Sequence, residues 1–260
     1  MRADSYLTEH GYVPSRERAK KIIAAGGVTV DGRPVKKPSE DIPEGEHLIV
    51  VTDSEKYVGR GGYKLEAAIT AFEMDVAGLR ALDVGASTGG FTDCLLQHGA
   101  RHVIAVDAGE GQLAAKLRDD PRVTNIEHLN ARGISLADIG GETVDLIVMD
   151  VSFISATYII PRFFSLLTEH GEAVCLIKPQ FEVGRAMLGK GGIVKDPATH
   201  RFAIERVLQA GKDFGLTPVG LIPSPILGGD GNREFLVRFQ KGAEEACMVD
   251  PIRVRRITGG

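Results

Sequence analysis

The chain has 260 residues, of which 43% are hydrophobic and 25% charged, and its formal net charge is −4. These values are typical of a globular protein with one large and one small domain. No run of 18 apolar residues occurs and the N-terminus has no apolar core, so we expect neither a transmembrane helix nor a signal peptide. The small net charge excludes a chain that is basic throughout, and any nucleic-acid-binding surface must be local.

Three cysteines, Cys94, Cys175 and Cys247, have an odd count and no metal-ligand spacing. This usage is typical of buried free thiols in a reducing compartment. We therefore expect a cytoplasmic protein without a metal site.

Basic side chains gather between residues 14 and 37. The pattern predicts a helix from Arg16, with Ser15 as its N-cap, that ends before Gly26. Two short strands across the Asp31-Gly32 turn are expected to follow. Basic residues on both elements favour a phosphate-binding surface over a face that is merely solvated. The predicted RNA-binding residues are Arg2, Arg16, Arg18, Lys20, Lys21, Arg33, Lys36 and, beyond this segment, Arg60.

The N-terminal segment resembles an S4 RNA-binding domain. The resemblance depends on Arg2, Asp4, Leu7, the helix with Ser15-Arg16 and Ala19, and the run Ala25-Gly26-Gly27-Val28-Thr29-Val30-Asp31-Gly32. Ala3 stands where the family usually has leucine, which is a small difference in packing. The resemblance implies a small α+β domain over residues 1–58 that binds RNA, and a purely structural module is the alternative.

Residues 59–63 read as a glycine-rich hinge between domains, and Tyr63-Lys64-Leu65-Glu66 opens a helix. Over residues 64–242, apolar β-like runs alternate with helical patterns, which predicts an α/β, doubly wound, mostly parallel sheet. The expected strands end near Asp83, Asp107, Glu127, Asp150 and Lys178, and two more include Val219–Ile222 and Phe235–Phe239. Residues 243–260 are polar or basic and predict a partly disordered tail.

A glycine-rich loop follows the first of these strands. Glycines at 85, 89 and 90 let the backbone approach a ligand closely, but their spacing departs from the dinucleotide fingerprint. Asp83 would repel a pyrophosphate and attract an amino group. Asp107, 22 residues after Gly85, lies where such folds bind ribose hydroxyls. The loop therefore favours S-adenosylmethionine over NAD, and a turn that only packs is the alternative.

Two later strands end in opposite charges. The apolar run before Asp150 and the run before Lys178 are both expected to be buried. An ionised side chain at such a position is costly unless it is paired or functional. The two side chains are expected to meet at the ligand-binding edge of the sheet, and an ion pair between strands is the alternative.

Lys64, Asp150, Lys178 and Glu234 fall where the Lys-Asp-Lys-Glu tetrad of FtsJ-like ribose 2′-O-methyltransferases falls. With the S4-like segment and the motifs Arg60-Gly61-Gly62-Tyr63-Lys64-Leu65, Asp150-Val151-Ser152-Phe153-Ile154-Ser155, Lys178-Pro179-Gln180-Phe181-Glu182 and Gly231-Asn232-Arg233-Glu234, the chain closely resembles the TlyA family, often labelled hemolysin A. Gly59 stands where the family usually has serine. The resemblance implies a Rossmann-like class I methyltransferase sheet, S-adenosylmethionine as cofactor and 2′-O-methylation of cytidine in ribosomal RNA. It also implies ribosomal RNA or subunits as partners, with no stable membrane association.

The resemblance also assigns roles to residues. The implied cofactor-binding set is Asp83, Gly85, Ser87, Gly89, Gly90, Asp107 and Asn130, with Asp107 at the ribose and Asn130 at the adenine edge. A ribose hydroxyl must lose its proton as it attacks, and a lysine accepts that proton only when neutral. Lys178 is the expected base and Asp150 its orienting partner, while Lys64 and Glu234 complete the network. The sequence leaves open which lysine takes the proton.

The sequence allows two interpretations of several other positions. Residues 184–195 are either a basic substrate clamp or a flexible connection, and Phe153 and Phe181 either stack on a nucleotide or pack in the core. Lys116 and Arg118 are expected to be solvated helix charges. A membrane-active cytolysin is disfavoured because no long basic amphipathic helix with aromatic anchors is present. The intact tetrad disfavours a non-catalytic ribosome assembly factor.

Overall fold

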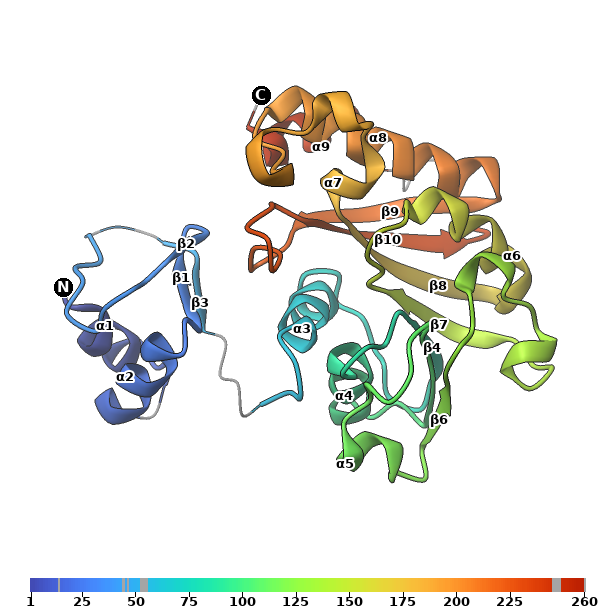
Figure 1. The fold of residues 1–260 in the computed structure, drawn as a ribbon, viewed down its shortest axis with the longest axis horizontal. Helices are drawn as coiled ribbons and strands as arrows, with labels where there is room; N and C mark the ends of the chain where they lie inside the picture. Colours follow the sequence, from blue (N-terminus) through green and yellow to red (C-terminus); the bar gives the residue numbers. More distant parts are fainter. Residues whose placement is uncertain (14, 44, 46, 52–55, 245–248, 260) are drawn as a thin grey trace.

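The computed structural model describes residues 1–13, 15–43, 45, 47–51, 56–244 and 249–259. It has a small N-terminal domain and a larger α/β domain, drawn on the left and right of Figure 1. Cys94 and Cys175 are free and buried, as predicted. Cys247 lies outside the described residues.

The N-terminal domain packs two helices against a three-stranded antiparallel sheet of order β2-β1-β3. Its elements are α1 (Ala3–Glu9), α2 (Arg16–Ala24), β1 (Val28–Val30), β2 (Arg33–Pro34) and β3 (Ile49–Val51). The predicted cap is confirmed, because the Ser15 side chain accepts a hydrogen bond from the backbone N–H of Arg18 at 3.2 Å. Leu7, Ile23 and Val28 form the centre of a separate core under these helices.

The large domain is built on a seven-stranded sheet of order β6-β5-β4-β7-β8-β10-β9. The first five strands in this order are parallel, and β10 runs antiparallel to both β8 and β9. All seven predicted strands are confirmed: β4 (Arg80–Val84), β5 (His102–Val106), β6 (Val123–Ile126), β7 (Val144–Met149), β8 (Leu167–Ile177), β9 (Leu216–Pro223) and β10 (Phe235–Lys241). The chain is therefore α/β and doubly wound, as the alternating pattern predicted.

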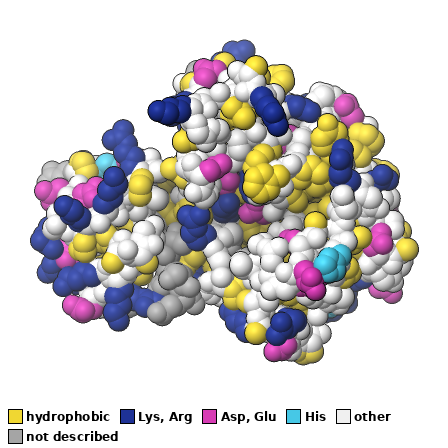
Figure 2. Space-filling model, in the orientation of Figure 1, with side chains coloured by type: hydrophobic (Ala, Val, Ile, Leu, Met, Phe, Trp, Pro, Cys, Tyr) yellow, Lys and Arg dark blue, Asp and Glu magenta, His cyan; other side chains and the backbone are white. Residues whose placement is uncertain are grey.

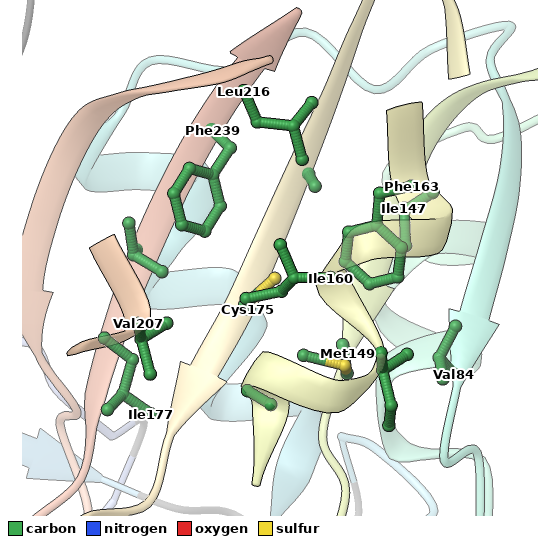
Figure 3. Close-up of a cluster of buried hydrophobic side chains, with 14 of the residues drawn as sticks. Val84, Ile147, Met149, Ile160, Phe163, Cys175, Ile177, Val207, Leu216 and Phe239 are labelled. Carbon is green, nitrogen blue, oxygen red and sulfur yellow. The ribbon is translucent and has the colours of Figure 1, made fainter. Parts of the chain in front are cut away.

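Helices cover both faces of this sheet (Figure 1). They are α3 (Gly61–Ala71), α4 (Gly90–Gln97), α5 (Ala115–Arg118), α6 (Phe163–Leu166), α7 (Pro179–Glu182), α8 (Pro197–Asp213) and α9 (Pro251–Thr258). Alternate strand residues enter opposite layers: Ile147 and Met149 pack under α6 and α8, whereas Leu146 and Val148 pack under α3 and α4. Figure 3 shows the first layer, with Phe163, Ile147, Ile160 and Met149 among its side chains.

The structure shows how residues 59–63, the expected hinge, pack against their neighbours. Gly61 begins α3, and a Cβ on Gly62 would lie 2.4 Å from the ring of Tyr57. A Cβ on Gly90 would lie 3.0 Å from the backbone nitrogen of Gly62. These glycines are needed because the start of α3 packs tightly against Tyr57 and the start of α4, and a hinge role for residues 59–63 stays a prediction.

The end of the chain also differs from the expected disordered tail. Pro251 opens α9, and the Asp250 side chain caps it by accepting a hydrogen bond from the N–H of Arg253 at 2.6 Å. Val254 is buried against α8 and β9. A short amphipathic helix with one buried stripe is mostly polar in sequence, which is why composition alone suggested disorder.

Candidate active site

Three adjoining cavities lie at the carboxyl ends of the parallel strands. The largest, about 530 Å³, is lined by Gly85, Asp107, Asn130 and Asp150 among others. A cavity of about 210 Å³ lies between the glycine loop and Lys178. The third, about 380 Å³, is bordered by Lys178, Gln180, Phe181, Asp230 and Glu234. Ser152 lines all three, so it marks the point where they meet.

The four residues of the expected tetrad come together beside these cavities. The Nζ atom of Lys178 is 2.6 Å from Oδ1 of Asp150, and the Nζ atom of Lys64 is 3.6 Å from Oδ2 of the same carboxylate. Lys64 also donates to Oε2 of Glu234 at 2.7 Å. Four elements supply them: α3 for Lys64 and the ends of β7, β8 and the start of β10 for the others. Asp150 therefore lies between two ammonium groups.

The two lysines have different surroundings. Lys64 is 7% exposed and lies between two carboxylates, which balances its charge. Lys178 borders two of the cavities, and besides its ion pair with Asp150 it donates a hydrogen bond to the hydroxyl oxygen of Ser152 at 2.8 Å. Burial raises the pKa of Glu234, and the neighbouring Lys64 opposes this rise. Lys178 is thus the lysine of the pair that borders the cavities.

The glycine loop between β4 and α4 has a backbone that side chains would disrupt. Gly85 has φ +84°, and a Cβ there would lie 2.5 Å from the carbonyl oxygen of Asp150. Gly89 has φ +93°, and its Cβ would lie 2.3 Å from Leu117. The loop is tied to β5 because the Asp107 carboxylate accepts hydrogen bonds from the N–H groups of Ser87 at 2.8 Å and Gly109 at 2.7 Å.

Asp83 lies beneath the loop and is fully buried, so it does not line the cavities as an open cation-binding carboxylate would. One oxygen, Oδ2, accepts from the hydroxyl of Thr92 at 2.6 Å, whereas Oδ1 has no partner among the described residues. Burial raises the pKa of this carboxyl to about 7, and the bond from Thr92 opposes the rise. A contact between Asp83 and a ligand stays a prediction.

Asn130 lines the largest of the three cavities, and its contact with an adenine edge stays a prediction. Its side-chain oxygen accepts from the N–H of Arg132 at 3.0 Å, which fixes the orientation of the amide. Leu129, Ile154 and Ile159 give the cavity apolar walls. Apolar walls with a few fixed polar groups are typical of sites for flat heteroaromatic rings.

Glu182 holds the loop after Asp150 against α7. Its carboxylate accepts from the hydroxyl of Ser155 at 2.5 Å and from the N–H of Ala156 at 2.8 Å. Burial raises the pKa of Glu182. Within this loop Phe153 adopts φ +65° and is 92% exposed, with its ring centroid 5.4 Å from that of Phe181. Phe153 is therefore not a core residue.

Residues 184–195 form two short 3₁₀ turns that border the third cavity through Leu188, Gly191 and Gly192. The fully buried Asn232 anchors them: its Oδ1 accepts from the N–H of Val194 at 2.8 Å, and its Nδ2 donates to the carbonyl of Gly192 at 3.2 Å. The segment is thus anchored beside the cavity, and a clamping role stays a prediction.

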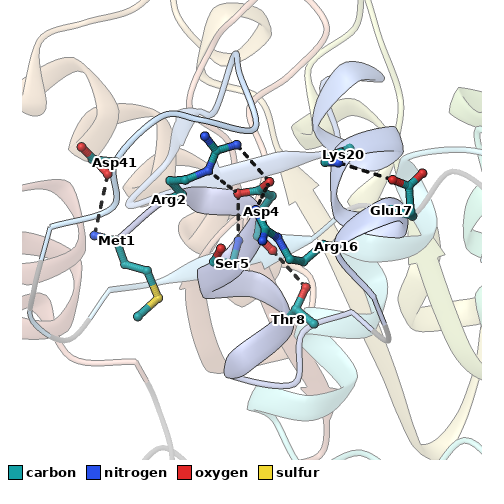
Figure 4. Close-up of polar contacts among 9 residues, drawn as sticks. All are labelled: Met1, Arg2, Asp4, Ser5, Thr8, Arg16, Glu17, Lys20 and Asp41. Atoms are coloured by element: carbon teal, nitrogen blue, oxygen red, sulfur yellow. Dashed lines mark hydrogen bonds and ion pairs between the residues drawn. The ribbon is translucent and has the colours of Figure 1, made fainter.

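The predicted RNA-binding residues divide into two groups. Arg2 and Arg16 both donate to Asp4, whose side chain is fully buried, at 3.0 Å each (Figure 4). The hydrogen bond from Arg2, followed by that from Arg16, holds the pKa of Asp4 well below its usual range. In the second group Arg18 is half-buried, and the other residues are exposed, namely Lys20, Lys21, Arg33, Lys36 and Arg60. Figure 2 shows that Lys and Arg side chains are frequent over the N-terminal domain.

Two further charges were expected to be merely solvated. Lys116 is half-exposed but pairs with the buried Asp93 at 2.9 Å, and Arg118 lies 3.6 Å from Asp119. Asp93 also accepts from the N–H of Val58 at 2.8 Å, which ties the start of the large domain to α4.

Sequence reasoning missed Ser152 and Glu182 as site residues, although both stand inside motifs that it quoted. Ser152 stands two residues after Asp150 beyond a strand end, and this position was a usable signal for a residue at the ligand edge. Glu182 gave no signal, because its partners lie 26 and 27 residues away in a loop.

The sheet order, the glycine loop after β4 and the polar strand ends define a methyltransferase of the Rossmann-like class. A solved S-adenosylmethionine-dependent methyltransferase from Mesorhizobium loti shares the fold, with a TM-score of 0.52 at 17% identity over 70% of this chain and 100% of that one. Residues 57–241 match the family model described as FtsJ-like methyltransferase, and residues 1–48 match the S4 domain.

The chain belongs to the TlyA family of FtsJ-like methyltransferases. The 16S/23S rRNA (cytidine-2′-O)-methyltransferase TlyA of Mycobacterium tuberculosis is 44% identical over 246 residues, covering 94% of this chain and 91% of that protein. Hemolysin A of Brachyspira hyodysenteriae is 44% identical over 239 residues, covering 92% and 99%. A solved structure described as a hemolysin from Streptococcus thermophilus has a TM-score of 0.75 at 38% identity, covering 100% and 94%. Among the described residues, no helix is long and apolar enough to cross a membrane.

Proposed function

We propose that this protein uses S-adenosylmethionine to methylate a ribose 2′-hydroxyl in ribosomal RNA, with cytidine as the target nucleoside. One observation carries the proposal: Lys178, paired to Asp150, stands where the loop-side cavity meets a second cavity that is open to a substrate. The match to relatives named for this reaction supports it.

The residues around the glycine loop fit the cofactor. The buried Oδ1 of Asp83 lacks a partner among the described residues and suits a nearby ammonium group, while the space beside Gly85 admits no Cβ. Asp107 and Asn130 border the apolar cavity and would hold the ribose and the adenine. When bound, S-adenosylmethionine supplies a sulfonium methyl group, whose carbon–sulfur bond breaks with the electron pair staying on sulfur as the ribose oxygen bonds to carbon.

Lys178 is the proposed base. As the 2′-oxygen attacks, the hydroxyl proton passes to the Nζ atom of neutral Lys178, which becomes an ammonium paired with Asp150. Lys64 lies between Asp150 and Glu234, and its positive charge offsets the negative charge near Lys178. General-base assistance of this kind contributes about 10²–10⁴ in rate.

The exposed lysines and arginines of the N-terminal domain would bind RNA phosphates and bring the target ribose to the large domain. The exposed Arg60 extends this surface toward the third cavity, since a Cβ on Gly229 would lie 3.5 Å from its guanidinium. RNA binding by these residues gives the methyl transfer its substrate.

The test measures transfer of labelled methyl groups to ribosomal subunits and to naked ribosomal RNA. Lys178→Ala should lower the transfer rate at least about 100-fold, because it removes the base, while calorimetry finds nearly unchanged cofactor affinity. The exposed Lys212→Ala is the matched control and should behave as wild type.

Full activity of Lys178→Ala would exclude the assigned base. A wild-type protein that binds cofactor and RNA but methylates neither substrate would instead be an assembly factor without catalysis. Position-resolved mapping of 2′-O-methyl groups in the labelled RNA then identifies the nucleotide, and a target other than cytidine would correct the proposed specificity.

A further inference from the structure

Ser152 has a position that the tetrad alone does not explain. It is the third residue after β7, its side chain is exposed, and it borders all three cavities of the site. Its hydroxyl oxygen accepts a hydrogen bond from the Nζ atom of Lys178 at 2.8 Å. Lys178 therefore has one hydrogen-bond acceptor, this hydroxyl, and one ion-pair partner, the Asp150 carboxylate at 2.6 Å.

A basic amine needs a directional partner if its lone pair is to have a fixed direction. A neutral lysine amine has two N–H bonds and one lone pair around a tetrahedral nitrogen. Without a hydrogen-bond acceptor, the amine rotates about the Cε–Nζ bond and the lone pair takes several directions. The hydroxyl of Ser152 holds one N–H bond beside the Asp150 carboxylate, so this hydrogen bond restricts the directions that the lone pair can take.

The loop that carries Ser152 is held firmly enough for this task. Glu182 accepts hydrogen bonds from Ser155 and Ala156 of this loop. Phe153, which adopts a positive φ, lies in the chain between Asp150 and these two residues. A left-handed backbone at a large side chain is costly and persists only when its surroundings impose it. Glu182 belongs to the same short helix, α7, that directly follows Lys178, so the serine and the lysine are held by one set of contacts.

Lys64 provides the contrast. Its hydrogen-bond acceptor Glu234 and its ion-pair partner Asp150 are both carboxylates, and it borders none of the three cavities. Two negative partners favour the ammonium form, whereas a hydroxyl is a neutral acceptor that adds direction with less preference for charge. The lysine beside the cavities thus has the partner set suited to a base, and the enclosed lysine has the set suited to a permanent cation.

We propose that Ser152 is a positioning residue for Lys178: its hydroxyl holds one N–H bond of the neutral amine, so that the lone pair faces the ribose hydroxyl. This inference rests on the proposed function. The proton moves from the 2′-hydroxyl to Lys178, and Ser152 neither gains nor loses a proton.

The first experiment measures single-turnover methyl transfer by Ser152→Ala, Ser152→Thr and the exposed control Ser165→Ala. Ser152→Ala should slow the maximal rate about 10-fold, the effect of one lost hydrogen bond in the transition state, with less than about 2-fold change in RNA and cofactor affinity. Ser152→Thr keeps the hydroxyl and should recover most of the rate. Ser165→Ala should match wild type.

The second experiment needs no methyl transfer. In the cofactor-free protein, the rate at which acetic anhydride labels Lys178 is followed against pH by mass spectrometry. A hydrogen bond to the hydroxyl favours the charged amine, so its loss in Ser152→Ala should shift the labelling midpoint of Lys178 to lower pH. The midpoint of the exposed Lys212 should stay constant.

Three outcomes would overturn the inference: a wild-type rate for Ser152→Ala, a loss confined to RNA affinity, or an unchanged labelling midpoint. Failure of the proposed function looks different. In that case wild-type protein transfers no methyl group at all, while the labelling midpoint still reports whether Ser152 holds Lys178.

Discussion

At the scale of single residues, Asp83 combines complete burial with an incomplete set of hydrogen bonds. Thr92 satisfies one carboxylate oxygen, and the other has no partner among the described residues. A buried carboxyl in this situation keeps its proton more readily than it does in water, and its pKa is raised from 3.8 to about 7. A cation placed beside it would reverse this rise.

This raised pKa gives a pH dependence with a definite sign. Between the unfolded and folded pKa values the folded protein holds a proton that the unfolded chain has released, so stability falls as the pH rises through about 7. Asp83→Asn should therefore gain stability relative to wild type between about pH 4 and about pH 8, as measured by urea unfolding without cofactor. An equal difference in unfolding free energy between Asp83→Asn and wild type at both pH values would show that Asp83 ionises normally.

The same residue predicts how cofactor binding responds to acid. If Asp83 faces the cofactor ammonium, wild-type affinity for S-adenosylmethionine should fall by up to about tenfold per pH unit below about pH 7, because the carboxyl must first lose its proton. Asp83→Asn should bind more weakly and lose this slope. Calorimetric titration across the pH range measures both, and parallel curves would place Asp83 outside the cofactor site.

At the scale of elements, the start of α3 and the start of α4 approach each other through glycines. Gly62 lies against the ring of Tyr57, and Gly90 lies against the backbone of Gly61 and Gly62. Lys64 stands on the same turn of α3, so this close approach sets the distance from Lys64 to Glu234 and Asp150.

Gly62→Ala should destabilise the protein by about 1–3 kcal/mol, since the new methyl group overlaps the Tyr57 ring. Urea unfolding measures the loss. Gly133→Ala is the matched control, because that glycine has no positive φ and no atom within 4 Å of the added Cβ, and its stability should stay near wild type. Equal unfolding curves for both variants would contradict the tight contact.

The elements of the large domain differ in how well the sequence predicts them. The strands were predictable because buried parallel strands are short apolar runs with charged ends, as at Asp150 and Lys178. The packing of residues 59–63 was not predictable, since a glycine needed for a turn and a glycine needed for a contact 28 residues away look identical in sequence. The tetrad was located through the family resemblance, and its ion-pair geometry required the fold.

At the scale of the whole molecule, the basic residues of the N-terminal domain have two different roles. Arg2 and Arg16 neutralise the buried Asp4, and this explains why a small domain keeps an acid in its core. Lys21 and Lys36 are exposed and free to meet phosphates. The sequence grouped all of these residues together, because a run of basic side chains does not reveal a buried acid twelve residues away.

These two groups should separate in experiment. Lys21→Ala and Lys36→Ala should each weaken RNA binding and reduce the slope of log affinity against log salt by about 1, with unchanged thermal unfolding. Arg16→Ala should instead lower the thermal midpoint, because Asp4 loses a charged partner. Affinity titrations at several salt concentrations, with melting curves of each variant, provide the comparison. An unchanged salt slope for both lysine variants would move the RNA surface elsewhere.

The contact between Gly85 and the carbonyl of Asp150 has a consequence for how this chain tolerates mutation. With 2.5 Å between an added Cβ and that oxygen, any side chain at Gly85 pushes on the residue that holds both lysines. The glycine loop, which would bind the cofactor, and Asp150, which would align the lysines beside the RNA, therefore cannot accept substitutions independently in evolution. In a library of single substitutions, Gly85 should be as intolerant as Asp150 itself, although it carries no reactive group.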